Sequence, residues 1–276
     1  MFDEDGVSFR VVVEPQDVKE YSHVLGGERV LALPKNNGGL VYSRNWIKKH
    51  AIAEGHARHW QFDDDITRMM RLYRGKRLPC DSDVAIRVLE DFVDRYENVA
   101  LASFNSEFFV PLTGMFAKAW PPFYLNARCY TCFLMLNSLP NRWRYRFNED
   151  TDMTLQVLAD GWCTILFNAF MIRTKATMTS SGGQTPIYES DGRLHMARQL
   201  ERVWPGVVTT KRKFNRPQHH IKGVWKKFDT QLIRRKDIDW DALERAGSNE
   251  YGLRLRAVKE VKDPGIRALL DEEEQT

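Results

Sequence analysis

The stretch HWQFDDDI, residues 59–66, decides how this chain is expected to fold. Aromatic residues at its start, Trp60 and Phe62, are typical of the end of a buried β-strand. Three consecutive aspartates, residues 63–65, then follow. Adjacent carboxylates repel one another and lose hydration beside a core, and a divalent cation bound to their oxygens relieves both costs. Because ligands of open α/β sheets collect at the carboxyl ends of strands, the triplet is a candidate metal site.

The same triplet is also typical of a solvated acidic turn, or of the N-cap of a helix that begins near Ile66. The preceding chain favours a sheet. Its apolar patterns and turn residues predict an order of strand, helix, strand, helix, strand over residues 9–15, 16–25, 29–33, 44–54 and 57–62, with Ser43 as the N-cap of the second helix. Such alternation predicts a layered α/β sheet with right-handed crossovers.

The rest of the chain continues this pattern less regularly. Strands are predicted over residues 98–103, 127–136, 162–172 and 206–210, and helices over 83–96, 152–160, 187–204, 239–246 and 253–261. A Gly/Ser loop at residues 177–185 is long enough to act as a lid. We therefore predict a Rossmann-like, mostly parallel central sheet flanked by helices in residues 1–228, followed by a helical or irregular C-terminal extension, residues 229–276.

Composition limits the class of protein. The chain has 276 residues, 43% of them hydrophobic, and a net charge of +4, and it contains neither a membrane-spanning apolar run nor a signal peptide. A cytoplasmic protein with reduced cysteines is expected. Cys129 and Cys132 form a CxxC motif, but a second metal-spaced pair is missing, so no zinc site is predicted.

A basic segment, KRKFNRPQHHIKGVWKK at residues 211–227, alternates cationic side chains with Phe214 and Trp225. This combination is suited to phosphates, either of a nucleotide or of a nucleic acid. A solvated surface loop would have the same composition, and the sequence leaves both interpretations open.

A second acidic cluster, NEDTD at residues 148–152, opens a predicted helix about 85 residues after the first. Acidic residues at this position also stabilise a helix dipole without any further role. If one cluster holds a divalent cation and the other supplies a general base, the pair suits sugar transfer from a nucleotide diphosphate to a hydroxyl. A metal-dependent nuclease and a non-catalytic DNA-binding accessory protein are the alternatives.

Four stretches carry a resemblance to a known family. They are SRNWIKKHAIAEGHARHWQFDDDI (residues 43–66), NEDTDMTLQVLADGW (148–162), SGGQTPIY (181–188) and RPQHHIKGVWKKF (216–228). Together they resemble the TET-associated glycosyltransferases, a GT-A-type family of mostly phage enzymes, over roughly residues 9–228. That family is thought to add sugars to 5-hydroxymethylpyrimidines in DNA. It often has Asp-Asp-Asn at positions 63–65, so the resemblance does not decide between Asp64 and Asp65 as the main metal ligand.

The resemblance implies a metal-dependent transfer from a nucleotide sugar, such as UDP-glucose, to the hydroxyl of 5-hydroxymethylcytosine in DNA. It implies Mn²⁺ or Mg²⁺ on the donor diphosphate, a location in the host cytoplasm for a phage-encoded enzyme, and no membrane partner; it leaves the oligomeric state open. The implied metal ligands are Asp64, Asp65 and one of His219 and His220; the implied donor contacts are Asp63, Arg44, Asn45 and Arg58; the implied acceptor base is Asp150, with Glu149 beside it.

Overall fold

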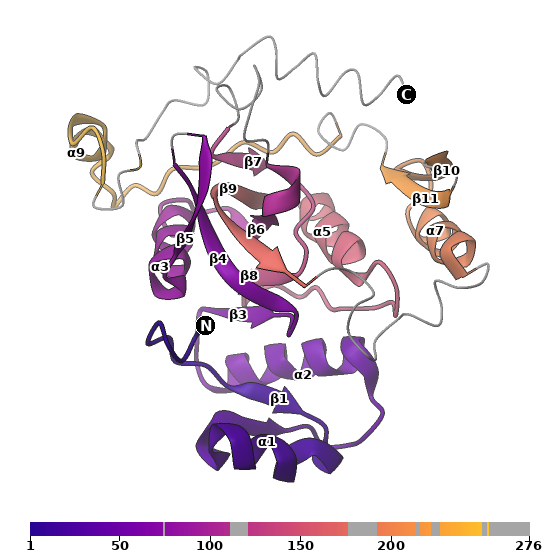
Figure 1. Cartoon of the computed structure of the whole chain (residues 1–276). Helices are drawn as coiled ribbons and strands as arrows, with labels where there is room; N and C mark the ends of the chain where they lie inside the picture. Colours follow the sequence, from indigo (N-terminus) through magenta and orange to yellow (C-terminus); the bar gives the residue numbers. More distant parts are fainter. Residues whose placement is uncertain are drawn as a thin grey trace.

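The fold centres on a seven-stranded sheet in a computed structural model (Figure 1), which describes residues 1–73, 75–110, 121–175, 192–213, 216–221, 227–249 and 253. The strands lie in the order β3-β8-β6-β9-β4-β5, and β7 also pairs with β9. Their bounds are β3 Arg58–Phe62, β4 Ile66–Tyr73, β5 Lys76–Cys80, β6 Val99–Ser106, β7 Phe123–Leu125, β8 Cys132–Leu136 and β9 Cys163–Thr174.

The central sheet is mixed, and the prediction of a mostly parallel sheet is wrong. Only β6 and β9 pair in parallel within it, while the other pairings are antiparallel. The physical reason lies in the connections after residue 62. A short turn joins β4 directly to its neighbour β5, and such a turn reverses the chain, whereas a parallel neighbour needs a long crossover. The turn after β3 leads to β4, which pairs with β5 and β9 and not with β3.

The predicted alternation at the start of the chain is present but lies mostly outside this sheet. Strands β1 (Val11–Val13) and β2 (Val30–Ala32) form a separate parallel pair, connected through α1 (Val18–Leu25). Helix α2 (Gly39–Ala53) then leads to β3. It begins before the predicted cap: Ser43 lies inside the helix, where its hydroxyl donates a hydrogen bond to the Gly39 carbonyl at 3.2 Å, so the N-cap prediction is wrong.

Helices cover both faces of the sheet. On one face, α3 (Ser82–Val93) packs through Leu89 and Val93 against Phe104 of β6. On the other, α5 (Glu149–Ala159) packs through Met153 against Phe133 of β8. Alternate residues of one strand point to opposite faces, so β8 and β6 serve both packing layers. This places the start of α5 beside the sheet.

A smaller layer forms beyond α5. Helix α7 (Gly192–Val203) and the antiparallel hairpin of β10 (Val208–Lys213) and β11 (Arg216–Ile221) pack against α5 through a cluster that includes Leu158, Leu200 and Val208. The interpretation of residues 211–227 as a loop is thus wrong for β10 and β11, which are paired strands. Arg212 and Arg216 are nevertheless exposed, and Lys211 is half-buried.

The chain after residue 228 packs back on the sheet layer. The Asn98 side chain donates to the Gln231 carbonyl at 2.8 Å, and the Glu97 amide donates to the Ile233 carbonyl at 2.9 Å. Helix α9 (Trp240–Arg245) confirms the helix predicted near residues 239–246. The predicted lid at 177–185 and nearly all of the helix at 253–261 lie outside the described residues. No described helix has the length and apolar character that a membrane crossing requires.

Candidate functional site

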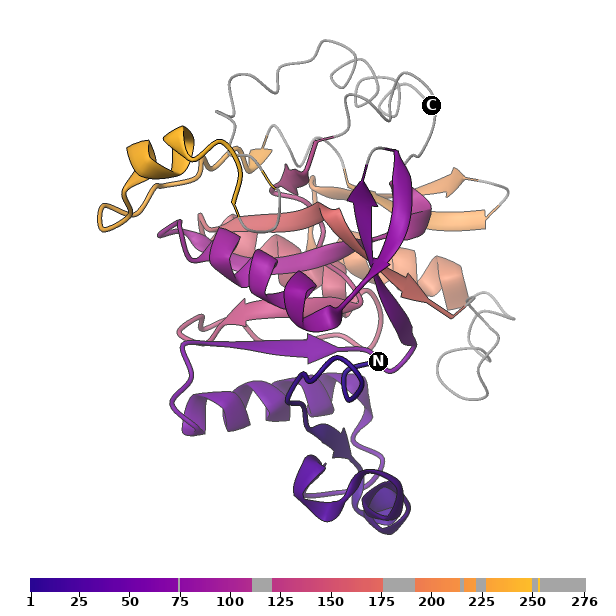
Figure 2. The same cartoon turned by 60° about the vertical axis from the view of Figure 1, so that its left-hand side comes forward.

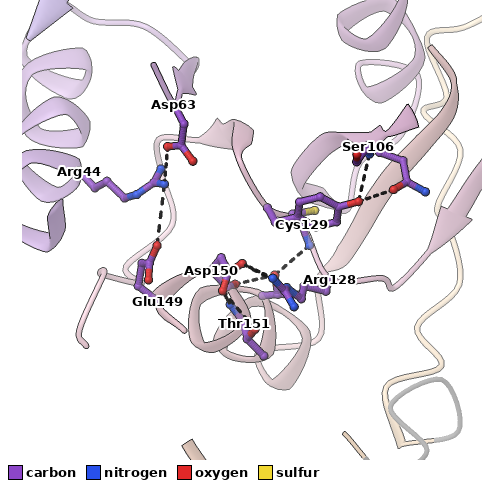
Figure 3. Close-up of polar contacts among 11 residues, drawn as sticks. Arg44, Asp63, Ser106, Arg128, Cys129, Glu149, Asp150 and Thr151 are labelled. Atoms are coloured by element: carbon purple, nitrogen blue, oxygen red, sulfur yellow. Dashed lines mark hydrogen bonds and ion pairs between the residues drawn. The ribbon is translucent and has the colours of Figure 1, made fainter. Parts of the chain in front are cut away.

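Arg44 joins the two acidic clusters (Figure 3). It projects from α2 and is buried; its Nη2 donates a hydrogen bond to Oδ1 of Asp63 at 2.8 Å and lies 4.0 Å from Oε1 of Glu149. Its guanidinium carbon lies 4.7 Å from the ring centroids of both Phe133 and Trp143, in cation–π contact. The end of β3 and the start of α5, far apart in sequence, therefore face one rigidly held cation.

This environment raises the pKa of the Asp63 carboxyl. Burial raises its pKa to about 6; the Arg44 charge opposes the rise, while the charges of Asp65 and Asp150 add to it. The repulsion from Asp150 is a second sign that the two clusters share one electrostatic environment.

The aspartate triplet itself is a turn between two strands. Asp63 directly follows β3, and Ile66 begins β4, so the interpretation as an N-cap of a helix near Ile66 is wrong. Two backbone hydrogen bonds hold the turn: the Asp63 amide donates to the Thr131 carbonyl, and the Lys175 amide to the Asp65 carbonyl, both at 2.9 Å. Pinned backbone at both ends fixes where the three carboxylates emerge.

Asp64 and Asp65 differ in exposure. Asp64 is exposed, whereas Oδ1 of Asp65 is buried without a hydrogen-bond partner among the described residues. A buried carboxylate oxygen without a partner is costly, and a cation relieves that cost. Two neighbouring carboxylates fit Mg²⁺ or Mn²⁺ well, since such ions fill their other positions with substrate phosphates and water.

The described residues do not complete a metal site by themselves. Among them, no group of three or more His, Cys, Asp or Glu side chains is gathered so that it could hold an ion. Asp63 pairs with Arg44, and Asp150 pairs with Arg128, so these two carboxylates already have arginine partners and do not join Asp64 and Asp65. A cation at Asp64 and Asp65 would therefore depend on oxygens brought by a substrate.

Both carboxylate oxygens of Asp150 accept hydrogen bonds. Its Oδ2 accepts hydrogen bonds from Nη2 and Nε of Arg128 at 2.7 and 3.1 Å, and its Oδ1 accepts from the Thr151 amide at 2.5 Å (Figure 3). Burial alone would raise the pKa of Asp150, but the Arg128 charge and the Thr151 amide outweigh it and lower the pKa below its ordinary value. Asp150 is therefore an oriented, ionised carboxylate.

Glu149, its neighbour, behaves in the opposite way. Burial, followed by repulsion from Asp150, raises the pKa of Glu149 to about 7, although Arg44 opposes the shift. Two adjacent carboxyls whose environments separate their pKa values are typical of acid–base sites. At neutral pH Asp150 therefore carries a negative charge, whereas Glu149 is near the midpoint of its titration and exchanges its proton readily.

His219 lies on the Asp150 side of the site. Burial and, to a lesser extent, the Arg128 charge lower its pKa to about 4, although the Asp150 charge opposes the shift. His219 is thus a neutral imidazole at neutral pH, the form that binds metals or accepts protons. His220 is next to it in β11, opposite Thr209, and adjacent residues of a strand point to opposite faces.

Two of the predicted donor contacts are engaged elsewhere. The Asn45 side chain donates to the carbonyls of Val41 and Trp143 and accepts from the Trp143 amide, so it ties α2 to Trp143. Arg58 lies at the opposite end of β3 from the triplet, where it donates to the Val99 carbonyl and pairs with Asp94. Neither the Arg58 guanidinium nor the Asn45 side-chain amide therefore lies beside the triplet.

Arg128 is a site residue that the sequence interpretation missed. It lies 22 residues before its partner Asp150, within the ARCYTC run that directs attention to cysteine spacing. The one available signal is a lone arginine at the edge of an apolar stretch, and a charge in that position usually has an acidic partner.

Comparison with known proteins adds one match. A family model described as TET-Associated Glycosyltransferase matches residues 2–183, which includes α2, the triplet and the whole of α5 and stops before β10. No curated protein and no solved structure matches the chain.

Proposed function

We propose, since this chain belongs to the TET-associated glycosyltransferase family, that it moves a sugar from a UDP-sugar to the hydroxyl of a 5-hydroxymethylpyrimidine, such as 5-hydroxymethylcytosine, in DNA. The reaction depends on Mn²⁺ or Mg²⁺. The single observation that carries the proposal is the convergence of both acidic clusters on Arg44, because it brings a candidate metal site and a candidate general base into one site.

On the donor side, Asp64 and Asp65 are the residues that would hold the cation. When bound, the ion neutralises the charge that develops on the departing nucleoside diphosphate. Asp63 faces the ribose or base of the donor, and Arg44 holds its carboxylate in one orientation at 2.8 Å. The partnerless Oδ1 of Asp65 supports this assignment, since it has no donor from the described part of the protein.

On the acceptor side, Asp150 takes the proton of the hydroxymethyl group as the bond to the sugar forms. A primary hydroxyl is too weak an acid to ionise near neutral pH, so a carboxylate within hydrogen-bond reach is needed. Arg128 and the Thr151 amide keep Asp150 ionised and oriented. A carboxylate has about four acceptor positions, and the Thr151 hydroxyl, which donates to Oδ1 at 3.2 Å, takes the fourth. The substrate hydroxyl would replace this longest of the four hydrogen bonds.

The test uses duplex DNA that contains 5-hydroxymethylcytosine, UDP-glucose and Mn²⁺. We expect release of UDP and a nucleoside heavier by one hexose, detected by mass spectrometry after digestion, and loss of both with EDTA. Parallel reactions with other UDP-sugars identify the donor. DNA cleavage without any sugar donor would instead establish the nuclease alternative, and DNA binding with neither reaction would establish the accessory protein.

A further inference from the structure

We propose that the β4–β5 hairpin, residues 66–80, together with Phe108 and Phe109, forms the surface that receives the acceptor duplex. The hairpin binds the phosphate backbone, and the two phenylalanines stack on the target base after it has rotated out of the helix. This inference rests on the proposed function, because it takes DNA as the acceptor.

The charge of the hairpin is the first observation. Five of its fifteen residues are Lys or Arg (Arg68, Arg71, Arg74, Lys76 and Arg77) and none is Asp or Glu. Lys76 is exposed, and among the described residues neither it nor Arg77 forms an ion pair with a carboxylate. A cationic ribbon of this kind is complementary to the dense negative charge of duplex DNA.

The shape of the hairpin is the second. Figure 2 shows β4 and β5 extending from the sheet on the side away from α1 and α2. Eight residues of β4 give a strand of roughly 26 Å, and a two-stranded ribbon fits the major groove of B-DNA. The strand begins directly after Asp65, so the ribbon runs from the candidate metal site outward to where flanking phosphates would lie.

The basic residues have an alternative explanation, because charge on an edge strand discourages pairing with other chains and β5 is an edge strand. A second feature favours a ligand. Arg71 lies over the rings of Tyr73 and Phe170, with its guanidinium carbon 5.5 and 5.6 Å from their centroids, and Arg77 donates to the Val110 carbonyl. These arginines are held in place, as a binding surface requires, whereas discouraging edge contacts needs only charge.

The exposed aromatic pair is the third observation. Phe108 and Phe109 follow β6 and have 69% and 67% of their surface exposed. Large apolar side chains this exposed and adjacent are a typical stacking surface for an unstacked base. Enzymes that modify a base commonly extrude it from the duplex in this way.

A continuous set of contacts joins the aromatic pair to the candidate base. Phe109 lies edge-on to Tyr130 with the centroids 6.4 Å apart, the Arg128 guanidinium carbon lies 5.3 Å from the Tyr130 centroid, and Arg128 pairs with Asp150. On the other side, the contact from Arg77 to the Val110 carbonyl joins Phe109 to the hairpin. The aromatic pair therefore lies between the phosphate-binding ribbon and the catalytic carboxylate.

The first experiment measures the salt dependence of DNA binding without a sugar donor. We compare the unmodified protein with the Lys76→Gln, Arg77→Gln double variant, and with Lys19→Gln, Lys49→Gln as the control, which removes the same charge from exposed sites on α1 and α2. Loss of two phosphate contacts should reduce the slope of log K against log salt by about two in the hairpin variant and leave the control unchanged. Equal slopes in both variants would overturn the phosphate-binding role of the hairpin.

The Lys76→Gln single variant guards against misfolding, because Lys76 is exposed beside the turn and its slope should fall by about one. If the unmodified protein neither binds DNA nor transfers sugar, the proposed function itself fails. If it transfers sugar normally while the hairpin variants keep the full slope, only the assignment of this surface fails.

The second experiment tests the stacking role. We place 2-aminopurine beside 5-hydroxymethylcytosine in a duplex, where its fluorescence rises when the neighbouring base leaves the stack. Phe109→Ala should abolish the rise and reduce transfer to duplex DNA about tenfold, with a smaller loss on single-stranded DNA. Phe109→Tyr, which keeps the ring, should restore both. A full fluorescence rise with Phe109→Ala would overturn the stacking role.

Discussion

The two acidic clusters of this protein have opposite environments. Asp150 is closed: its two oxygens accept hydrogen bonds from Arg128 and the Thr151 amide. The turn that holds Asp64 and Asp65 is open: one carboxylate is exposed and the other has a buried oxygen with no partner in the described chain. The first is prepared by the protein alone, whereas a bound cation would complete the second.

In the proposed reaction, this difference would separate the two halves of the transfer. A general base must be ionised and oriented before the acceptor arrives, so its partners belong to the fold. A cation that accompanies a nucleotide diphosphate is partly bound by the substrate, so the protein needs to supply only some of its ligands. Arg44, which contacts Asp63 and approaches Glu149, is the point at which the two halves meet.

The largest expected effect follows from substitutions in the open cluster, Asp64 and Asp65. Asp65→Ala should abolish transfer and weaken metal-dependent donor binding, and EDTA should do the same to the unmodified protein, because the neutral side chain cannot hold the cation against the diphosphate. Titration of UDP-glucose with and without Mn²⁺ measures the binding. Asp64→Ala is the matched variant on the exposed neighbour. Full activity in EDTA would show that the triplet has no metal role.

A substitution in the closed cluster should lower the rate of transfer and leave donor binding nearly unchanged. Asp150→Asn keeps the shape of the side chain, so donor and metal affinity should stay nearly normal while transfer falls by at least about two orders of magnitude, the usual contribution of a general base. Glu149→Gln should be milder. Single-turnover rates at saturating donor separate chemistry from binding. An inactive Glu149→Gln beside an active Asp150→Asn would reverse the two roles, and two active variants would reduce the cluster to a helix cap.

The two clusters also differ in how far sequence alone predicts them. The strand that ends at Phe62 and the helix after Asn148 follow from local apolar patterns and acidic starts, and both are confirmed within a few residues. What the aspartates contact is not local. Arg44 lies 19 residues before Asp63, and Arg128 lies 22 before Asp150, on segments that only the folded sheet brings together.

Strand direction was the larger failure of prediction, for a similar reason. A repeated strand–helix order predicts parallel neighbours, and β1 and β2 do pair in that way. No strand is predicted between the triplet and residue 83, although MRLYRGKRL, residues 70–78, alternates around a glycine. Gly75 has φ +72°, the left-handed region that a tight turn favours, and it closes the β4–β5 hairpin.

A smaller effect concerns pH and the pair at the start of α5. The folded-state pKa of Glu149, about 7, lies above its ordinary value of 4.5, so the folded protein binds more protons between these two values. The free energy of unfolding should therefore fall as pH rises from about 5 to 8, by up to about 3 kcal/mol from this group. Glu149→Gln should remove that component. Urea unfolding at several pH values measures it.

Asp63 contributes a change of the same sign, since burial raises its pKa to about 6, and it stays in both proteins. The quantity to compare is therefore the difference between the unmodified protein and Glu149→Gln. If the two proteins lose stability in parallel from pH 5 to 8, Glu149 does not hold a proton in the fold, and the separation of the two carboxyls is wrong. Asp150, whose pKa is lowered, should destabilise the protein only as pH falls through the acid range.

The smallest expected effect tests whether the two clusters share a ligand. His219 is the neutral imidazole on the Asp150 side, and His220 points to the other face of β11, so only His219 should bind the cation. His219→Ala should then need several-fold more Mn²⁺ for half-maximal rate, with His220→Ala as the control.

Because the described residues do not gather three metal ligands, this role requires the β10–β11 hairpin to approach the triplet when the donor binds. That requirement gives the prediction a second readout. With UDP and Mn²⁺ present, hydrogen exchange of the β11 amides should slow in the unmodified protein and less so in His219→Ala. Unchanged Mn²⁺ titrations for both histidine variants would leave His219 beside Asp150 alone, and the open and closed clusters would then meet only at Arg44.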